Sequence, residues 1–496
     1  MDRSLAARRR PLFPAICLAW LFIRFLYDAS RQLAPDEAYY WVWSRHLAAC
    51  YLDHPPMVAL LIRASTTIFG QTELGVRIGA AILTLVMILV TVELAKTVSG
   101  NQQGGTLAAW VLLLSPMAIG LGTIVTPDTP ACFFSICALA CAVAVFPDSE
   151  KPRSVLWIPF GLFLGLALAS KYTSVLVGIS VLLALLTHRQ GRRELLRPWS
   201  WLGALIALAV FLPVVMWNRD HHWASFEFQW HHGTQAANAE APSPLADLGY
   251  FVLGQAGVFT PVLFVMMLAA ALSALRNWSR LPLRMRLVLI SAIVPILFFA
   301  AVSLRHKPEA NWPIFAFLPA TVLLAYWMTQ SPRPLAQRWF PTGVIVAAVM
   351  AVGAQIPEMI QLVPTRMLPN IPSTWEDLFG WREMGRELDE LCIGGVVYCT
   401  TYENAGEASF YMSGHPDVWM MDSDRATAFD FFPGRPDPAS LGLAVCVRNL
   451  RRTPGPEGPL PAELKAAGLD KIEIVHWQAS ALGRVVRRRE FLVAER

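Results

Sequence analysis

The sequence predicts an all-helical membrane protein of about eleven transmembrane helices, followed by a small α/β domain. Three observations support this prediction. The chain has 496 residues, of which 55% are hydrophobic and 16% are charged, whereas a soluble domain carries about 25% charged residues. Apolar runs long enough to cross a bilayer recur along the first 360 residues. The last 127 residues differ, with 14 Lys or Arg and 19 Asp or Glu, and resemble an ordinary water-soluble domain.

This composition excludes a cytosolic enzyme, a disordered regulator and a small disulfide-framework protein. The formal net charge of +5 is modest and gives no reason to expect a nucleic-acid partner. We therefore predict a transmembrane module over residues 1–360 and a soluble extracytoplasmic domain over residues 361–496.

The eleven predicted spans share an apolar stretch of about 15 to 27 residues, close to the length needed to cross a bilayer. They cover residues 11–28, 76–95, 106–123, 130–146, 155–169, 172–187, 200–217, 249–275, 287–304, 313–328 and 340–357. Helices satisfy every backbone polar group internally, which an open chain in lipid requires.

The Lys and Arg residues between the spans set the orientation. With the N-terminus inside, the inner segments hold 17 Lys or Arg and the outer loops hold 7. Since positive residues concentrate on the cytoplasmic side, we expect a cytoplasmic N-terminus. An odd number of spans then places the C-terminal domain outside.

The first outer loop and the tail carry secondary-structure signals of their own. Residues 37–47 and 56–69 each predict an amphipathic helix lying on the membrane surface, and the aromatic residues Tyr39, Tyr40, Trp41 and Trp43 suit the headgroup layer. In the tail, helical and strand patterns alternate. Of its three cysteines, Cys392 and Cys399 are one possible disulfide pair.

Ionisable and polar residues gather at the outer ends of the spans. They are Asp36 and Glu37, Asp53 and His54, Asp128, Lys171 and Tyr172, and His306, Lys307, Glu309 and Asn311. Such residues are costly near lipid unless they face a polar cavity, so a functional site is the first hypothesis. Simpler roles stay open: Asp36 and Glu37 as helix caps, Asp128 as a cap and Lys171 as a snorkelling anchor.

Carboxylates beside cations at this boundary suit one kind of chemistry. A carboxylate can deprotonate an acceptor hydroxyl as a general base. Lys and His can hold a phosphate and neutralise the charge that develops as it leaves. A donor with a lipid tail and a phosphate head would place its head among these residues.

These residues also carry a family resemblance. The Asp36-Glu37 pair, the helices after it, the Asp53-His-Pro-Pro56 element, the Thr126-Pro-Asp128 loop, the spans and the tail resemble the GT-C glycosyltransferases. The chain is most similar to the bacterial branch of the dolichyl-phosphate-mannose–protein mannosyltransferase superfamily. That branch includes aminoarabinose transferases of lipid A and galacturonosyltransferases of lipid A and core. The tail stretch 402–416 matches as well.

The resemblance implies a polyprenyl-phosphate sugar donor and inverting transfer to a glycolipid or glycan acceptor on the outer face of a bacterial inner membrane. By that resemblance Asp36 is the base, Glu37 supports substrate binding and Asp128 matches the acidic residue of the second loop. Lys171, His306 and Lys307 are candidates for the donor phosphate on chemical grounds. A divalent metal held by Asp36, Glu37 and Asp128 is possible, but we expect no cofactor, since cationic side chains are present.

Two other functions compete with the glycosyltransferase. A lipid-linked sugar transporter or flippase fits the number of spans, but transporters place their sites near the midplane. A non-catalytic scaffold or sensor would not depend on Asp36, Lys171 or Lys307. The sugar, the acceptor and the prenyl chain length stay open.

Overall fold

The computed structural model describes residues 12–148, 151–234, 244–305, 309–330, 334–356, 373–423, 425–449, 461–481 and 484–496. The chain divides into two compact units. The first comprises Met1–Phe25, His54–Leu61 and Ile78–Gln355, and the second comprises Leu26–Asp53, Ile62–Arg77 and Ile356–Arg496. His306 and Lys307, two of the predicted site residues, lie outside the described residues.

The first unit is helical throughout its described part. Three helices continue from one unit into the other near the start of the chain: α2 (Leu12–Ser30), α4 (Met57–Phe69) and α5 (Glu73–Ser99). The other α-helices are α6 (Gln102–Leu113), α7 (Pro116–Thr123), α8 (Asp128–Ala144), α9 (Trp157–Leu168), α10 (Val175–Leu186), α11 (Arg189–Leu195), α12 (Pro198–Asp220), α13 (Ala224–Thr234), α14 (Pro244–Phe259), α15 (Pro261–Arg276), α16 (Leu283–Ser303), α17 (Phe317–Gln330) and α18 (Pro334–Gln355). Short 3₁₀ turns, among them η2 (Tyr172–Ser174) and η4 (Ile314–Ala316), precede some of them.

The apolar helices make the chain a multi-pass membrane protein. Among the described residues five helices are long and apolar enough to cross a bilayer, or up to eight if each bent pair counts as one span. Every run predicted as a span is largely helical. Helices such as α8, with 17 residues, are shorter than the 18 residues taken as the minimum for a span. The predicted number of eleven spans is therefore not confirmed.

Two of the predicted spans are not straight. Residues 249–275 form α14 and α15, which meet at a bend of 105°, and residues 106–123 form α6 and α7, which meet at 61°. A proline begins the second helix of each pair, and proline lacks the N–H that would continue the helical hydrogen bonds. At the sharper bend Thr260 has a φ of 87° and caps α15 by accepting from the Leu263 N–H.

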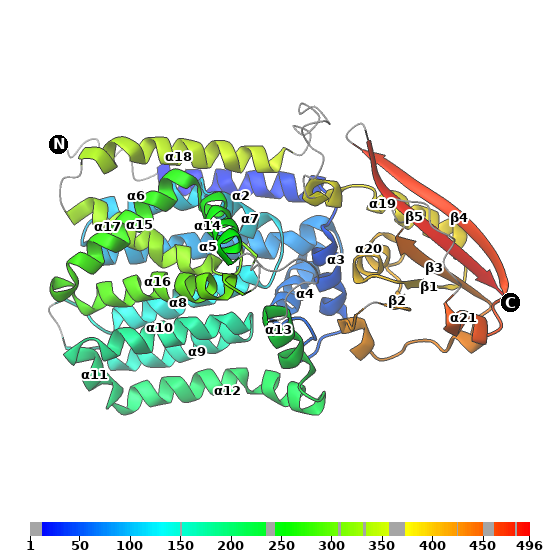
Figure 1. The fold of residues 1–496 in the computed structure, drawn as a ribbon, viewed down its shortest axis with the longest axis horizontal. Helices are drawn as coiled ribbons and strands as arrows, with labels where there is room; N and C mark the ends of the chain where they lie inside the picture. The colour runs from blue at the N-terminus through cyan, green and yellow to red at the C-terminus, as the bar shows by residue number, and fades with distance from the viewer. Residues whose placement is uncertain are drawn as a thin grey trace. The chain divides into compact units, whose positions relative to one another are not determined.

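Close helix packing holds the first unit together. Figure 1 shows its long helices running side by side. Helices α9 and α12 cross where glycines face each other, and a Cβ on Gly161 would lie 1.9 Å from the Gly203 carbonyl oxygen. Small residues let helix backbones approach in this way within a membrane.

The second unit contains a five-stranded sheet with helices. Its helices are α3 (Pro35–Arg45), most of α4 (Met57–Phe69), α19 (Trp381–Leu391), α20 (Tyr402–Tyr411) and α21 (Ala462–Ala466). Its strands are β1 (Val396–Cys399), β2 (Trp419–Met420), β3 (Leu443–Asn449), β4 (Lys471–Ala481) and β5 (Arg484–Glu495). The predicted small α/β domain is therefore present in the tail.

The strand order is β2-β1-β3-β5-β4 (Figure 1). Strand β1 pairs in parallel with β2 and β3, with Tyr398 opposite Trp419 and Cys446, and β5 pairs antiparallel with β3 and β4. The buried strands β1 and β3 are nearly continuous apolar runs, as expected of parallel strands covered on both faces.

Helix α3 packs against α20 inside the second unit. A Cβ on Gly406 of α20 would lie 2.8 Å from the Tyr39 backbone nitrogen, so the glycine permits the close approach. Tyr39, Tyr40, Trp41 and Trp43 are all buried, and Trp41 meets Phe410 edge to face at 4.9 Å. The prediction that these aromatic residues lie in the headgroup layer is therefore wrong, because α20 covers α3 and removes them from solvent.

The second unit combines segments that are far apart in the chain. Segments of the first loop, Leu26–Asp53 and Ile62–Arg77, cluster with the C-terminal residues, although the predicted domain boundary lay at residue 360. The eight cysteines, all of them described, are free thiols.

Candidate functional site

The adjacent acidic residues Asp36 and Glu37 have different surroundings in the second unit. Glu37 is fully buried, and its Oε2 lies 2.6 Å from Nη2 of Arg77 on α5. The same guanidinium donates to the backbone carbonyls of Arg31 and Gln32. Glu37 Oε2 also accepts from the Ala34 N–H at 2.9 Å. Glu37 therefore caps α3 and anchors the first loop to the start of α5.

Asp36 is exposed to solvent at the start of α3. Its Oδ1 accepts a hydrogen bond of 3.1 Å from the hydroxyl of Tyr402, the first residue of α20. Pro35 precedes it at the first helical position, where the missing N–H of proline costs nothing. The capping alternative thus describes Glu37, whereas Asp36 presents a carboxylate that solvent can reach and that Tyr402 orients.

A second carboxylate lies in the same unit. Asp53 is buried, and its Oδ2 accepts a hydrogen bond of 2.7 Å from Tyr39. Its Oδ1 lies 3.0 Å from Nη1 of Arg425. The Arg425 guanidinium also lies over the ring of Tyr402, 4.7 Å from its centroid. Tyr402 and Arg425 therefore connect Asp36 and Asp53 within one polar cluster, which we call the Asp36 cluster.

The tyrosines of this cluster are hydrogen-bond donors at neutral pH. Burial raises the pKa of Tyr39 well above its usual value, and the nearby charge of Asp53 raises it further. Burial and the charge of Asp36 likewise raise the pKa of Tyr402. Both phenols therefore stay protonated, and each donates a hydrogen bond to its carboxylate.

The first unit holds the other candidate cluster. Lys171 Nζ lies 2.7 Å from Asp128 Oδ1, and the Asn311 side-chain amide donates to Asp128 Oδ2 at 2.9 Å. Asp128 and Lys171 are 4% and 8% exposed, so the pair is nearly closed to water. Three segments that are distant in sequence thus supply one group, which we call the Asp128 cluster.

The remaining predicted residues make other contacts. The Tyr172 hydroxyl hydrogen-bonds the Ser225 hydroxyl at 2.7 Å, and the buried Gln255 amide donates to the Ala310 carbonyl beside Asn311. Glu309 is exposed, and His54 is half-buried in the first unit. Their roles stay predictions.

Sequence reasoning missed Arg77, Tyr402 and Arg425 as members of the site. Arg77 had a signal, because it is a lone charge at the start of the apolar run 76–95. Tyr402 begins the tail stretch on which the resemblance partly rests, but nothing in its neighbourhood points to Asp36. Arg425 had no local signal at all.

Comparisons with known proteins show which sequences and folds the chain is similar to. Residues 53–217 match the family model described as dolichyl-phosphate-mannose-protein mannosyltransferase. The chain is 26% identical to a lipid A galacturonosyltransferase of Rhizobium johnstonii over 386 residues, 74% of each chain. It is 23% identical to an undecaprenyl phosphate-α-4-amino-4-deoxy-L-arabinose arabinosyl transferase of Proteus mirabilis over 481 residues, 92% of this chain and 80% of the relative.

The fold has a solved counterpart. The crystal structure of ArnT from Cupriavidus metallidurans bound to undecaprenyl phosphate superposes with a TM-score of 0.66, covering 97% of both chains at 16% identity. This likeness shows the fold. The family model and the curated relatives show sequence similarity to glycosyltransferases. These matches together show that the chain is similar to bacterial membrane glycosyltransferases and shares the fold of one of them.

Proposed function

We propose that the protein transfers a sugar from a polyprenyl-phosphate donor to a hydroxyl of lipid A, lipopolysaccharide core or another envelope glycan. Transfer takes place on the extracytoplasmic face of the inner membrane and inverts the anomeric centre. The N-terminus is cytoplasmic and the C-terminal residues are extracytoplasmic. The lipid-linked sugar named for the arabinosyl transferase and the undecaprenyl phosphate bound to ArnT support this choice, as does the excess of Lys and Arg in the inner loops.

The proposed base is Asp36. Its carboxylate removes the proton from the acceptor hydroxyl, whose oxygen then attacks the anomeric carbon of the donor. The bond from that carbon to the phosphate oxygen breaks, and polyprenyl phosphate leaves with the bonding electrons. The observation that carries the proposal is the contrast between the exposed Asp36, oriented by Tyr402, and the buried Glu37, which is neutralised by Arg77. Glu37 supports the reaction by positioning α3.

The proposed phosphate contact is Lys171. Its ammonium group would neutralise the charge that develops on the leaving phosphate. Asp128 and Asn311 hold Lys171 in place through hydrogen bonds of 2.7 and 2.9 Å around the same carboxylate. His306 and Lys307 are proposed as further phosphate contacts on their chemistry alone. We further propose that these cations, and no divalent metal, stabilise the leaving group.

The test is transfer by the purified full-length protein in lipid nanodiscs. Asp36→Asn keeps the shape and the Tyr402 contact but removes the basic carboxylate, and we expect transfer to fall by about 10²- to 10⁴-fold. Asp470→Asn, at an exposed carboxylate of the same unit, is the matched control and should transfer normally. Near-normal transfer by Asp36→Asn would contradict the proposal.

Mass spectrometry of extracted glycolipids identifies the acceptor. A deletion strain should lose one sugar from one glycolipid and accumulate the polyprenyl-phosphate sugar, and the wild-type gene should restore both. The flippase alternative predicts movement of the lipid-linked sugar across proteoliposomes without a transfer product.

A further inference from the structure

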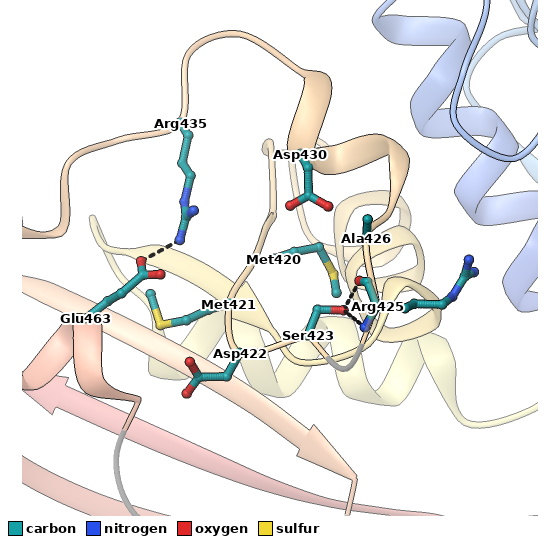
Figure 2. A pocket seen from close by; sticks show the side chains of 9 residues that line it. All are labelled: Met420, Met421, Asp422, Ser423, Arg425, Ala426, Asp430, Arg435 and Glu463. Atoms are coloured by element: carbon teal, nitrogen blue, oxygen red, sulfur yellow. Dashed lines mark hydrogen bonds and ion pairs between the residues drawn. The ribbon is translucent and has the colours of Figure 1, made fainter. Parts of the chain in front are cut away.

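A polar hollow of about 290 Å³ opens in the second unit, and of its lining residues only Arg425 belongs to the clusters described above. Five charged side chains line it: Asp422, Arg425, Asp430, Arg435 and Glu463. Figure 2 shows Arg435 and Glu463 on one side of the hollow and Asp430 on the other. Its volume is near the lower limit of small-molecule sites, about 300 Å³.

The hollow has a position typical of binding sites. Met421, Asp422 and Ser423 follow the carboxyl end of β2, which is parallel to β1. Open α/β sheets bind ligands at the carboxyl ends of their parallel strands. Asp422 has a φ of +50°, and a non-glycine residue in this left-handed region is uncommon and found often at functional sites.

The charges of the hollow favour one ligand chemistry. Arg435 pairs with Glu463 at 2.6 Å and Arg425 pairs with Asp53 at 3.0 Å. Both guanidinium groups therefore already have a carboxylate counter-ion. The Asp422 carboxylate is exposed to solvent where it lines the hollow. An anion would meet this carboxylate unfavourably, whereas the hydroxyl or amine hydrogens of a sugar would satisfy it.

Arg425 connects the hollow to the proposed base. Its side chain extends away from the hollow in Figure 2, and its guanidinium reaches Asp53 and the ring of Tyr402. The Tyr402 hydroxyl in turn contacts Asp36. A ligand in the hollow is therefore separated from Asp36 by two side chains.

We propose that this hollow binds a hydroxyl- or amine-bearing sugar ring of the acceptor, beside the hydroxyl that Asp36 deprotonates. The inference rests on the proposed function, since it names the substrate that the same site receives. Asp422 is the principal contact, and Asp430, Arg435 and Glu463 line the hollow around it.

Ligand-observed NMR on the full-length protein in nanodiscs tests the proposal, with glucosamine as the probe and glucosamine 6-phosphate as its anionic counterpart. Asp422→Asn keeps the size of the side chain, and Asn tolerates the same positive φ. We expect it to weaken glucosamine binding about tenfold, because a charged hydrogen bond is lost. Asp470→Asn should bind as the wild type does, and the phosphate should bind more weakly than glucosamine.

Equal glucosamine binding by the wild type and Asp422→Asn, or tighter binding of the phosphate, would overturn the proposal. Transfer kinetics separate this failure from that of the proposed function. Asp422→Asn should raise the acceptor KM about tenfold and leave the donor KM unaltered. If Asp36→Asn is inactive while Asp422→Asn has a normal acceptor KM, only the subsite is wrong. If Asp36→Asn transfers normally, the proposed function itself falls.

Discussion

The Tyr402 hydroxyl donates a 3.1 Å hydrogen bond to Asp36 Oδ1, although 366 positions separate the two residues in the chain. The first helix of the first loop and a helix of the C-terminal region thus meet at the proposed base. The close approach of α20 to α3 at Gly406 makes this contact possible. The C-terminal residues are therefore part of the candidate site.

Removing this hydrogen bond should change the pH dependence of transfer. Tyr402→Phe keeps the ring under Arg425 but loses the hydroxyl, and a hydrogen bond to a carboxylate favours its charged form. We expect the acid limb of the kcat/KM profile to move to higher pH by about one unit, so that the rate falls by up to about tenfold on the acid limb and little at neutral pH. Tyr398→Phe, another buried tyrosine of the unit, is the control. An unshifted profile in Tyr402→Phe would show that the hydroxyl does not act on the base.

Glu407 of α20 should make stability depend on pH. Its carboxyl is fully buried, and neither oxygen has a hydrogen-bond partner among the described residues. Burial raises its pKa well above the usual value; the charges of Glu37 and Asp377 raise it and those of Arg487 and Arg77 lower it. At low pH both folded and unfolded states hold the proton. As pH rises past the ordinary carboxyl pKa, the unfolded chain ionises first, so the folded state loses relative stability.

Glu407→Gln removes this titration. We expect the variant to match the wild type near pH 4 and to exceed its stability at pH 8 by about 1–3 kcal/mol. Thermal unfolding of both proteins in the same detergent across this pH range measures the difference. The opposite result would be a stability difference between variant and wild type that turns against the variant as the pH rises from 4 to 8. That result would mean that Glu407 is charged in the folded protein.

The Lys171–Asp128 pair can be tested as a unit. Lys171→Met leaves the buried Asp128 carboxylate uncompensated, so both stability and turnover should fall, the latter by about 10²- to 10³-fold. Adding Asp128→Asn removes that charge and should restore stability. Because the double variant still lacks the ammonium group, its turnover should stay low.

A purely structural pair would give a different result, with turnover recovering together with stability in the double variant. Arg197→Met offers a matched control, because it breaks an ion pair of the same unit in which Glu194 is buried. Thermal unfolding and donor turnover, measured on the same preparations, distinguish the two cases.

Chelation should not affect transfer. In the Asp128 cluster, Lys171 and Asn311 already occupy the carboxylate that a divalent ion would need. Activity in nanodiscs should therefore be the same with and without about 5 mM EDTA, well above the micromolar range of ordinary Ca²⁺ sites. Loss of transfer on chelation, restored by Mg²⁺ or Mn²⁺, would show that a metal holds the phosphate.

Several features were predictable from the sequence because they depend on local pattern. Apolar length predicted where the helices of the first unit lie, since lipid requires internally bonded backbone. Charge density separated the C-terminal region, and amphipathic patterns located both first-loop helices, α3 and α4. Asp36, Asp128, Lys171 and Asn311 were found because charged and polar groups are rare beside apolar runs.

The tertiary structure decided which of these residues are in contact. Adjacent in sequence, Asp36 and Glu37 differ because Arg77 takes only Glu37 into a buried ion pair. Asp128 meets Lys171 and Asn311 only through helix packing, and Tyr402 reaches Asp36 only because Gly406 lets α20 approach α3. Hydropathy and propensity report a residue's neighbours along the chain, whereas ion pairs and hydrogen bonds depend on distances that packing sets.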